Sequence, residues 1–197
     1  RLPVSDPLSF TGLQLKRSLE DRGVRIRGAV VPVREPGFSP LGSGGEGEFA
    51  EGSGLRILAS YSSPPLLEVL RYINKESNNF LAETVSKTVG RIAVGEGSFE
   101  GGQRAIRNFL VRVVGVDSLE VTVRDGSGLS AANQASPAVF VQLLDYMASS
   151  PHWDVFWSTL PEAGVRRELG RMSRSPAAGN LRAKTGTLRG VSALSGM

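Results

Sequence analysis

Arg182-Ala183-Lys184-Thr185-Gly186-Thr187-Leu188 is the stretch of sequence that decides the fold. In a β-strand, Lys184 and Gly186 point to one face and the two threonines to the other. At a strand edge, the backbone and hydroxyl groups beside a glycine can meet an incoming extended peptide. A Cβ atom at Gly186 would hold that peptide away. The stretch therefore predicts a peptide-binding strand, and a surface lysine beside a turn is the alternative.

A second polar cluster, Lys75-Glu76-Ser77-Asn78-Asn79, lies between two segments with helical apolar periodicity. Residues two apart on a helix face different directions, so Ser77 and Asn79 can share a cleft only where a helix starts or a loop intervenes. The density of Ser and Asn favours such a junction, in which both residues could also serve simply as helix caps. We expect this junction to face the Lys184 strand across a groove.

The composition excludes several classes of protein and site. Of the 197 residues, 40% are hydrophobic and 21% are charged, which is typical of a globular domain. The sequence contains no run of about 18 apolar residues, so no transmembrane segment is predicted. The net charge is +4, but the basic residues are scattered, so no nucleic-acid partner is expected.

The chemistry open to an enzyme is also restricted. The chain has no cysteine and one histidine, His152. Aromatic residues surround His152 in the sequence, which indicates a packed or half-buried side chain. We therefore expect no disulfide, no thiolate nucleophile, no metal site and no cofactor. Acid–base chemistry would fall to a lysine or a carboxylate, which favours a Ser-Lys mechanism.

The remaining segments predict a mixed α/β (α+β) chain without repeats. Residues 36–54 are rich in Gly, Ser and Glu and are interpreted as a loop, not a domain boundary. Ser63 is expected to cap a helix that begins at Pro64. A helix is expected after the 75–79 cluster, with an apolar buried side made of Leu81, Val85, Val89 and Ile92. The other predicted elements are helices at 7–22, 99–114 and from Ser136-Pro137, a turn at 125–130, and strands at 24–33, 55–61, 119–123, 180–188 and 190–196.

Together these motifs resemble the active-serine penicillin-recognising enzymes. Lys184-Thr185-Gly186 matches their Lys-Thr-Gly motif, and Ser77-Asn78-Asn79 matches their Ser-x-Asn motif. The blocks Ser62–Leu66 and Asp125–Ser130 extend the likeness over essentially the whole chain. The specific resemblance is to the low-molecular-mass class C penicillin-binding proteins, the D-alanyl-D-alanine carboxypeptidase/endopeptidase family (peptidase family S13-like). It implies a penicillin-binding protein/β-lactamase-like transpeptidase fold, an antiparallel sheet flanked by helices plus a helical subdomain, incomplete in this chain.

One departure from the family pattern is large, because no serine in this chain has a lysine three residues later. In the family the nucleophile lies in such a Ser-x-x-Lys motif, far upstream. We therefore expect residues 1–197 to be the C-terminal portion of one penicillin-binding catalytic domain, inactive alone and completed by a missing N-terminal segment. The alternatives are an inactive wall-binding or regulatory relative, or a β-lactamase. A β-lactamase would need a deacylating glutamate, and Glu83, Glu96, Glu100 and Glu120 lie in no matching context.

The resemblance also implies roles for individual residues. Ser77 would relay a proton, Asn79 would hold a substrate carbonyl, and Lys184 would supply positive charge. Thr185, Gly186 and Thr187 would bind substrate, the two hydroxyls taking its terminal carboxylate. The turn Asp125–Ser130 is interpreted as structural.

The activity implied is that of a serine-type D-Ala-D-Ala carboxypeptidase/endopeptidase acting on peptidoglycan through an acyl-enzyme. Its partners would be peptidoglycan stem peptides, with β-lactam antibiotics as inhibitors. The location implied is periplasmic or otherwise extracytoplasmic.

Overall fold

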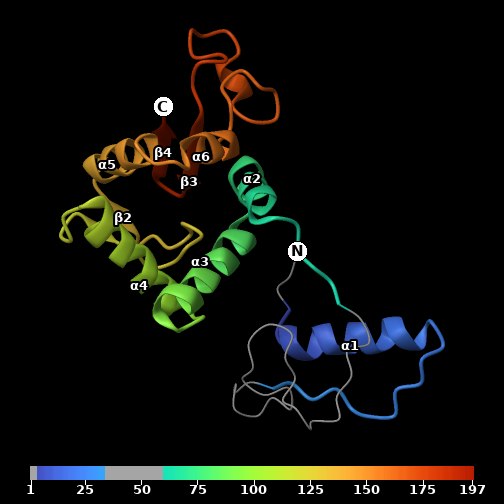
Figure 1. The fold of residues 1–197 in the computed structure, drawn as a ribbon. Helices are drawn as coiled ribbons and strands as arrows, with labels where there is room; N and C mark the ends of the chain where they lie inside the picture. Colours follow the sequence, from blue (N-terminus) through green and yellow to red (C-terminus); the bar gives the residue numbers. More distant parts are fainter. Residues whose placement is uncertain (1–3, 34–59) are drawn as a thin grey trace. The chain divides into compact units, whose positions relative to one another are not determined.

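The computed structural model describes residues 4–33 and 60–197. Contacts between residues divide the chain into two units, Arg1–Tyr61 and Ser62–Met197, which Figure 1 colours from blue to red along the sequence. Whether both belong to one catalytic domain remains a prediction.

The first unit contains helix α1, Pro7–Glu20. Asp6 caps its start, since Oδ1 accepts a hydrogen bond from the Ser9 N–H at 3.3 Å and Oδ2 accepts one from the Ser9 hydroxyl at 2.8 Å. Pro7 suits the first helical position, where no N–H is needed. The helix predicted over 7–22 is thus confirmed to within two residues.

The strand predicted over 24–33 is wrong. These residues form no strand pairing, and the segment is tied to α1 by Lys16 Nζ, which donates to the Gly28 carbonyl at 2.8 Å. A strand is stable only when its backbone groups find a partner strand, and the described part of this unit offers none. The predicted loop over 36–54 and most of the predicted strand over 55–61 lie outside the described residues.

The second unit begins with helix α2, Leu66–Glu76. Pro65 occupies the N-cap position and no side chain caps the helix, so the prediction that Ser63 caps a helix starting at Pro64 is wrong. The reason is steric, because a residue that precedes a proline is driven to extended backbone. Ser63 and Pro64 each precede a proline, so the first helical turn forms only after Pro65.

Helices α3, Asn79–Val94, and α4, Phe99–Phe109, pack side by side (Figure 1). Their contact is made of small residues, with Ser86 and Gly90 of α3 buried against the start of α4. The apolar face expected on α3 is only partly used, since Val89 is 41% and Ile92 81% exposed. The close approach of the two backbones, and not an apolar stripe, therefore determines how these helices pack.

A first apolar core forms where α4 continues into a π-helical turn, Leu110–Val114 (η2). The strands β1, Val121–Thr122, and β2, Gln134–Ala135, pair antiparallel beside it, and α5, Pro137–Ala148, covers it. The predicted strand over 119–123 is thus present but short. The buried residues of this core are Leu110, Val116, Val121 and Val139.

The chain then forms α6, Trp153–Thr159, a 3-10 turn Gly170–Met172 (η3), and the hairpin β3, Ala183–Leu188, with β4, Val191–Gly196. The hairpin confirms the two strands predicted at the end of the sequence, and it turns at Gly190, whose φ is 79°. A second core of Ala163, Leu169 and Ala183 fixes the start of β3. Of the helices described, none has both the length and the apolar character needed to cross a membrane.

The close approach of α3 and α4 generates a prediction. A Cβ atom at Gly90 would lie 2.6 Å from the backbone of Gly101 and of Gly102, and backbone cannot yield as a side chain can. We expect Gly90→Ala in the full-length protein to lower the free energy of unfolding by about 1–3 kcal/mol, measured by urea denaturation. Gly97→Ala is the matched control, since its Cβ would meet Arg91 at an ordinary 3.5 Å. Equal stability of the two variants would contradict this packing.

Candidate active site

Ser77 lies at the corner between α2 and α3. It has φ 52° and ψ 47°, and it is the one non-glycine residue of the described ranges with a positive φ. Asn78 caps the next helix, its Oδ1 accepting from the Leu81 N–H at 2.9 Å. The junction is therefore the helix start that the sequence predicts, with Asn78 and not Asn79 as the cap. A left-handed serine costs about 1–3 kcal/mol, so its persistence marks the position as a candidate site.

Lys184 of β3 reaches this corner from the far end of the sequence. Its Nζ donates a hydrogen bond to Ser77 Oγ, 107 residues away, and a second to the Thr185 carbonyl at 2.8 Å. Burial lowers the pKa of Lys184 below its ordinary value of 10.5. The two motifs thus meet as predicted, and they pair a hydroxyl with an ammonium that gives up its proton more readily than usual.

The last turn of α2 is docked on the segment that follows α5. Asn74 Nδ2 donates to the buried Thr159 Oγ1 at 2.8 Å, and Lys75 Nζ pairs with Glu168 Oε1 at 2.6 Å. One turn earlier, Arg71 donates to Ser158 Oγ at 3.1 Å. These contacts hold the helix end that carries Ser77.

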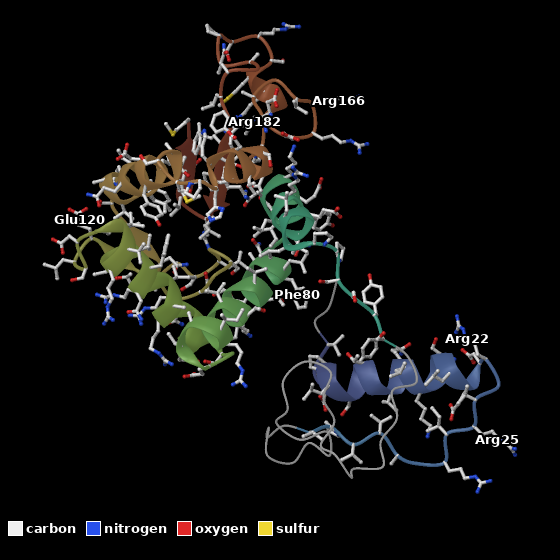
Figure 2. All side chains as sticks on the ribbon, in the orientation of Figure 1. Arg22, Arg25, Phe80, Glu120, Arg166 and Arg182 are labelled. Carbon is white, nitrogen blue, oxygen red and sulfur yellow. The ribbon has the colours of Figure 1, made fainter. Side chains whose placement is uncertain are left out.

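The same segment holds the start of β3. The Ala183 N–H donates to the Pro161 carbonyl at 2.9 Å, and Arg182 pairs with Glu162 at 2.6 Å. The Arg182 guanidinium also lies over the ring of Trp157 in α6, with 5.8 Å between the guanidinium carbon and the ring centroid. Arg182 is labelled in Figure 2. Ser77 and Lys184 are therefore positioned by one shared support.

Glu168 is the charged centre of that support. Burial alone would raise its pKa, but hydrogen bonds from Lys75 and the Glu162 N–H, and the charges of Lys75 and Arg182, outweigh burial and lower the pKa below 4.5. Glu168 is thus a carboxylate whose charge is neutralised within the fold.

Thr185, Gly186 and Thr187 lie on β3, which pairs with β4 along one edge. A Cβ atom added at Gly186 would meet only Ala193 Cβ, at an ordinary 3.9 Å. At Gly196, by contrast, it would lie 2.1 Å from the Arg182 carbonyl oxygen. Packing in the described part of the chain thus requires a glycine at 196 but not at 186.

The structure does not bring the Asn79 side chain into a hydrogen bond with the other predicted site residues. Asn79 is the exposed first residue of α3, and its side chain makes no hydrogen bond with the residues described. Its expected contact with a substrate carbonyl stays a prediction.

The turn Asp125–Ser130 is anchored on α3. Glu83 Oε2 accepts from the N–H groups of Gly126 at 3.0 Å and Ser127 at 3.2 Å. Asp125 accepts from the N–H groups of Gly128 and Ser130 and from Asn133. Burial alone would raise the Asp125 pKa, but these hydrogen bonds lower it. The sequence had not assigned Glu83 this anchoring role.

The supporting role of Asn74, Lys75, Thr159 and Glu168 was not predicted from the sequence. A signal was present on α2, because Arg71, Asn74 and Lys75 follow the i, i+3, i+4 spacing of one helix face. A polar stripe on a helix with an opposite apolar face predicts a polar partner. No comparable pattern marks Glu168, which is 93 residues from Lys75.

The fold and the Ser77–Lys184 contact define the class of the protein, which is that of the penicillin-binding/β-lactamase-like fold. Penicillin binding protein 4 (DacB) of Haemophilus influenzae, solved in complex with a β-lactam, superposes with a TM-score of 0.79 and 26% identity. The match covers 99% of this chain and 42% of that one. The family model described as D-Ala-D-Ala carboxypeptidase 3 (S13) matches residues 1–197, and the chain belongs to that family.

Curated relatives agree with this family. A D-alanyl-D-alanine carboxypeptidase of Actinomadura sp. (strain R39) is 34% identical over 98% of this chain and 34% of its own length. Carboxypeptidase DacB of Mycolicibacterium smegmatis is 35% identical over 74% of this chain and 34% of its own length. The chain thus spans about a third of the length of these relatives.

The neutralised pair Lys75–Glu168 predicts a pH dependence of stability. Above pH 4.5, the ordinary pKa of the carboxyl, its stabilisation is fully present, and it is lost as pH falls through the lower pKa of the folded state. We expect Glu168→Gln to lower the free energy of unfolding by about 1.5–3 kcal/mol near neutral pH. This difference should shrink in acid, where the wild-type carboxyl is also uncharged.

Urea denaturation of the full-length protein from about pH 7 to about pH 3 measures this difference. The control is Glu76→Gln, whose carboxylate is exposed and makes no hydrogen bond or ion pair with the described residues. A deficit of Glu168→Gln that does not change with pH would contradict the charge pairing.

Proposed function

We propose that the protein of which this chain forms part is a serine-type D-Ala-D-Ala carboxypeptidase, with endopeptidase activity, that acts on peptidoglycan through an acyl-enzyme. The observation that carries the proposal is the hydrogen bond from Lys184 to Ser77 Oγ, in a chain of the S13 family. It joins the two motifs that such an enzyme needs.

The proposed roles follow from this contact. No Ser-x-x-Lys motif occurs in these 197 residues, so the nucleophilic serine lies elsewhere in the whole protein. Its hydroxyl gives its proton to the lysine of the same motif as its oxygen attacks the penultimate D-Ala carbonyl. The peptide C–N bond then breaks, and the leaving amine takes a proton. Ser77 hands its proton to that amine and is reprotonated by Lys184, a transfer that the lowered Lys184 pKa favours. Water then hydrolyses the ester.

Substrate recognition is proposed to use the edge of β3. An extended stem peptide would lie along Thr185–Thr187, whose hydroxyls would take the terminal carboxylate. The Thr187 N–H would supply half of an oxyanion hole. Asn79 would hold a backbone carbonyl of the peptide from the start of α3.

The partners proposed are peptidoglycan stem peptides, with β-lactams as covalent inhibitors. The support is the family of the chain and its structural likeness to a penicillin-binding protein solved with a β-lactam. Since peptidoglycan lies outside the cytoplasm, we propose a periplasmic or extracytoplasmic location.

Penicillin labelling of the full-length protein tests this function. We expect a fluorescent penicillin to label the wild type covalently. Ser77→Ala should slow acylation by about 10²- to 10⁴-fold, because general acid–base help is lost. Ser149→Ala, an exposed serine at the end of α5, is the control and should label like the wild type. Absence of labelling would overturn the proposal, and binding of peptidoglycan fragments without labelling would favour an inactive wall-binding relative.

Gly186 provides an independent prediction. Its neighbours leave room for a Cβ atom, so Gly186→Ala should keep the melting temperature of the wild type. It should nevertheless slow penicillin acylation at least tenfold, because a methyl group would hold the ligand backbone off β3. Gly196→Ala should instead lower the melting temperature clearly, because its Cβ atom would clash with the Arg182 carbonyl oxygen. Unchanged acylation in Gly186→Ala would contradict a ligand on this strand edge.

A further inference from the structure

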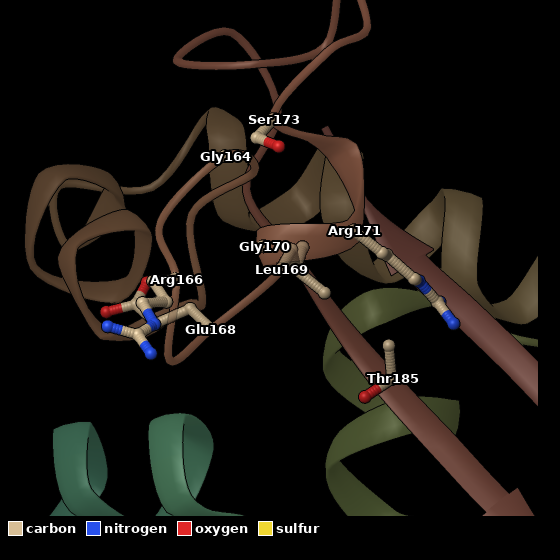
Figure 3. Close-up of a pocket in the computed structure, with 8 residues that line it drawn as sticks. All are labelled: Gly164, Arg166, Glu168, Leu169, Gly170, Arg171, Ser173 and Thr185. Atoms are coloured by element: carbon tan, nitrogen blue, oxygen red, sulfur yellow. The ribbon is translucent and has the colours of Figure 1, made fainter.

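A pocket of about 440 Å³ lies beside β3, between Thr185 and the loop 164–173 (Figure 3). Arg166, Glu168 and Arg171 supply its charged groups. In Figure 3, Arg166 and Glu168 lie toward one side of the pocket and Arg171 and Thr185 toward the other. Thr185 therefore belongs both to this pocket and to the candidate active site.

The charge of the pocket is positive. Arg166 and Arg171 are exposed, and neither makes a hydrogen bond or ion pair with any residue of the described ranges. Glu168 does not offset them, because Lys75 pairs with it at 2.6 Å and the Glu162 N–H donates to its second oxygen. Two guanidinium groups thus remain available to a ligand.

Guanidinium groups favour carboxylates, which they bind through two parallel hydrogen bonds. A leaving D-alanine has one carboxylate and a methyl side chain, so once Thr185 holds that carboxylate nothing remains to occupy the pocket. A leaving residue with a second carboxylate on its side chain would reach the arginines while its terminal carboxylate stays at Thr185.

We propose that this pocket is a specificity subsite that binds a second carboxylate on the residue released by the enzyme. The proposal rests on the function proposed above and deepens it. Arg171, which shares its side of the pocket with Thr185, is the principal contact, and Arg166 contributes from the other side. The enzyme would then favour acidic leaving residues over neutral ones of the same size.

The test compares peptides that differ only in the leaving residue. The full-length protein is given one acyl-D-Ala peptide ending in D-Glu, its neutral isostere ending in D-Gln, and one ending in D-Ala. Release of the last residue gives kcat/KM for each. We expect the wild type to prefer D-Glu to D-Gln about tenfold, the effect of one hydrogen bond to a charged group. High salt should reduce that preference.

Arg171→Gln should abolish the preference and leave cleavage of the D-Ala peptide unchanged. The matched control is Arg174→Gln, which removes the same charge from an exposed residue just after the loop and outside the pocket, and which should keep the preference. Arg166→Gln should weaken the preference, with its neighbour Arg167→Gln as control.

Three results would overturn the inference. The first is equal cleavage of the D-Glu and D-Gln peptides by the wild type. The second is an Arg171→Gln variant that loses activity equally on all three peptides, since that indicates a structural role. The third is failure to cleave any peptide or to be labelled by penicillin, which would remove the proposed function and this subsite together. Cleavage without preference therefore separates failure of the subsite from failure of the function.

Discussion

The docking of α2 on the segment 158–168 is the constraint on which the site depends. Ser77 follows Lys75 by two residues, and Lys75 is fixed by Glu168 while Asn74 is fixed by the buried Thr159. The same segment receives β3 through Pro161 and Glu162, only a few residues before Lys184. The path from Ser77 to Lys184 through the support is therefore short, although the two residues are 107 apart in sequence. A short support leaves the two side chains little freedom to move, and catalysis requires such fixed positions.

Two features of the site are unfavourable in free energy, and the contacts of the support must offset them. Ser77 adopts a left-handed backbone conformation that most residues avoid, and the Lys184 ammonium is partly desolvated. Neither feature benefits the fold by itself. Functional sites are where such local conflicts are retained, because the surrounding structure compensates for them. Here the compensation comes from Ala183, which is fully buried, and from the ion pairs Lys75–Glu168 and Arg182–Glu162.

The sequence predicted those features that depend on local pattern. Helix α1, the Ser77 junction and the β3–β4 hairpin follow from apolar periodicity, polar clusters and turn residues, and the structure confirms them. The predictions were wrong where contacts with other elements determine the local structure. The strand over 24–33 lacks a partner in the described part, and α3 buries Ser86 and Gly90 in place of Ile92 because α4 approaches with glycines. The motifs identified Ser77 and Lys184, but Glu168, which supports them, lies in a region without any periodic signal.

The ion pair between Lys75 and Glu168 has two effects. By pairing with Glu168, Lys75 fixes the end of α2 and hence Ser77. By neutralising the same carboxylate it leaves Arg166 and Arg171 to determine the charge of the pocket beside Thr185. An unpaired Glu168 there would repel any anionic ligand by several kcal/mol at short range. One ion pair therefore fixes both the position of Ser77, the proposed proton relay, and the charge of the neighbouring pocket. The proposed leaving-group preference and the position of Ser77 should change together among relatives in which that pair differs.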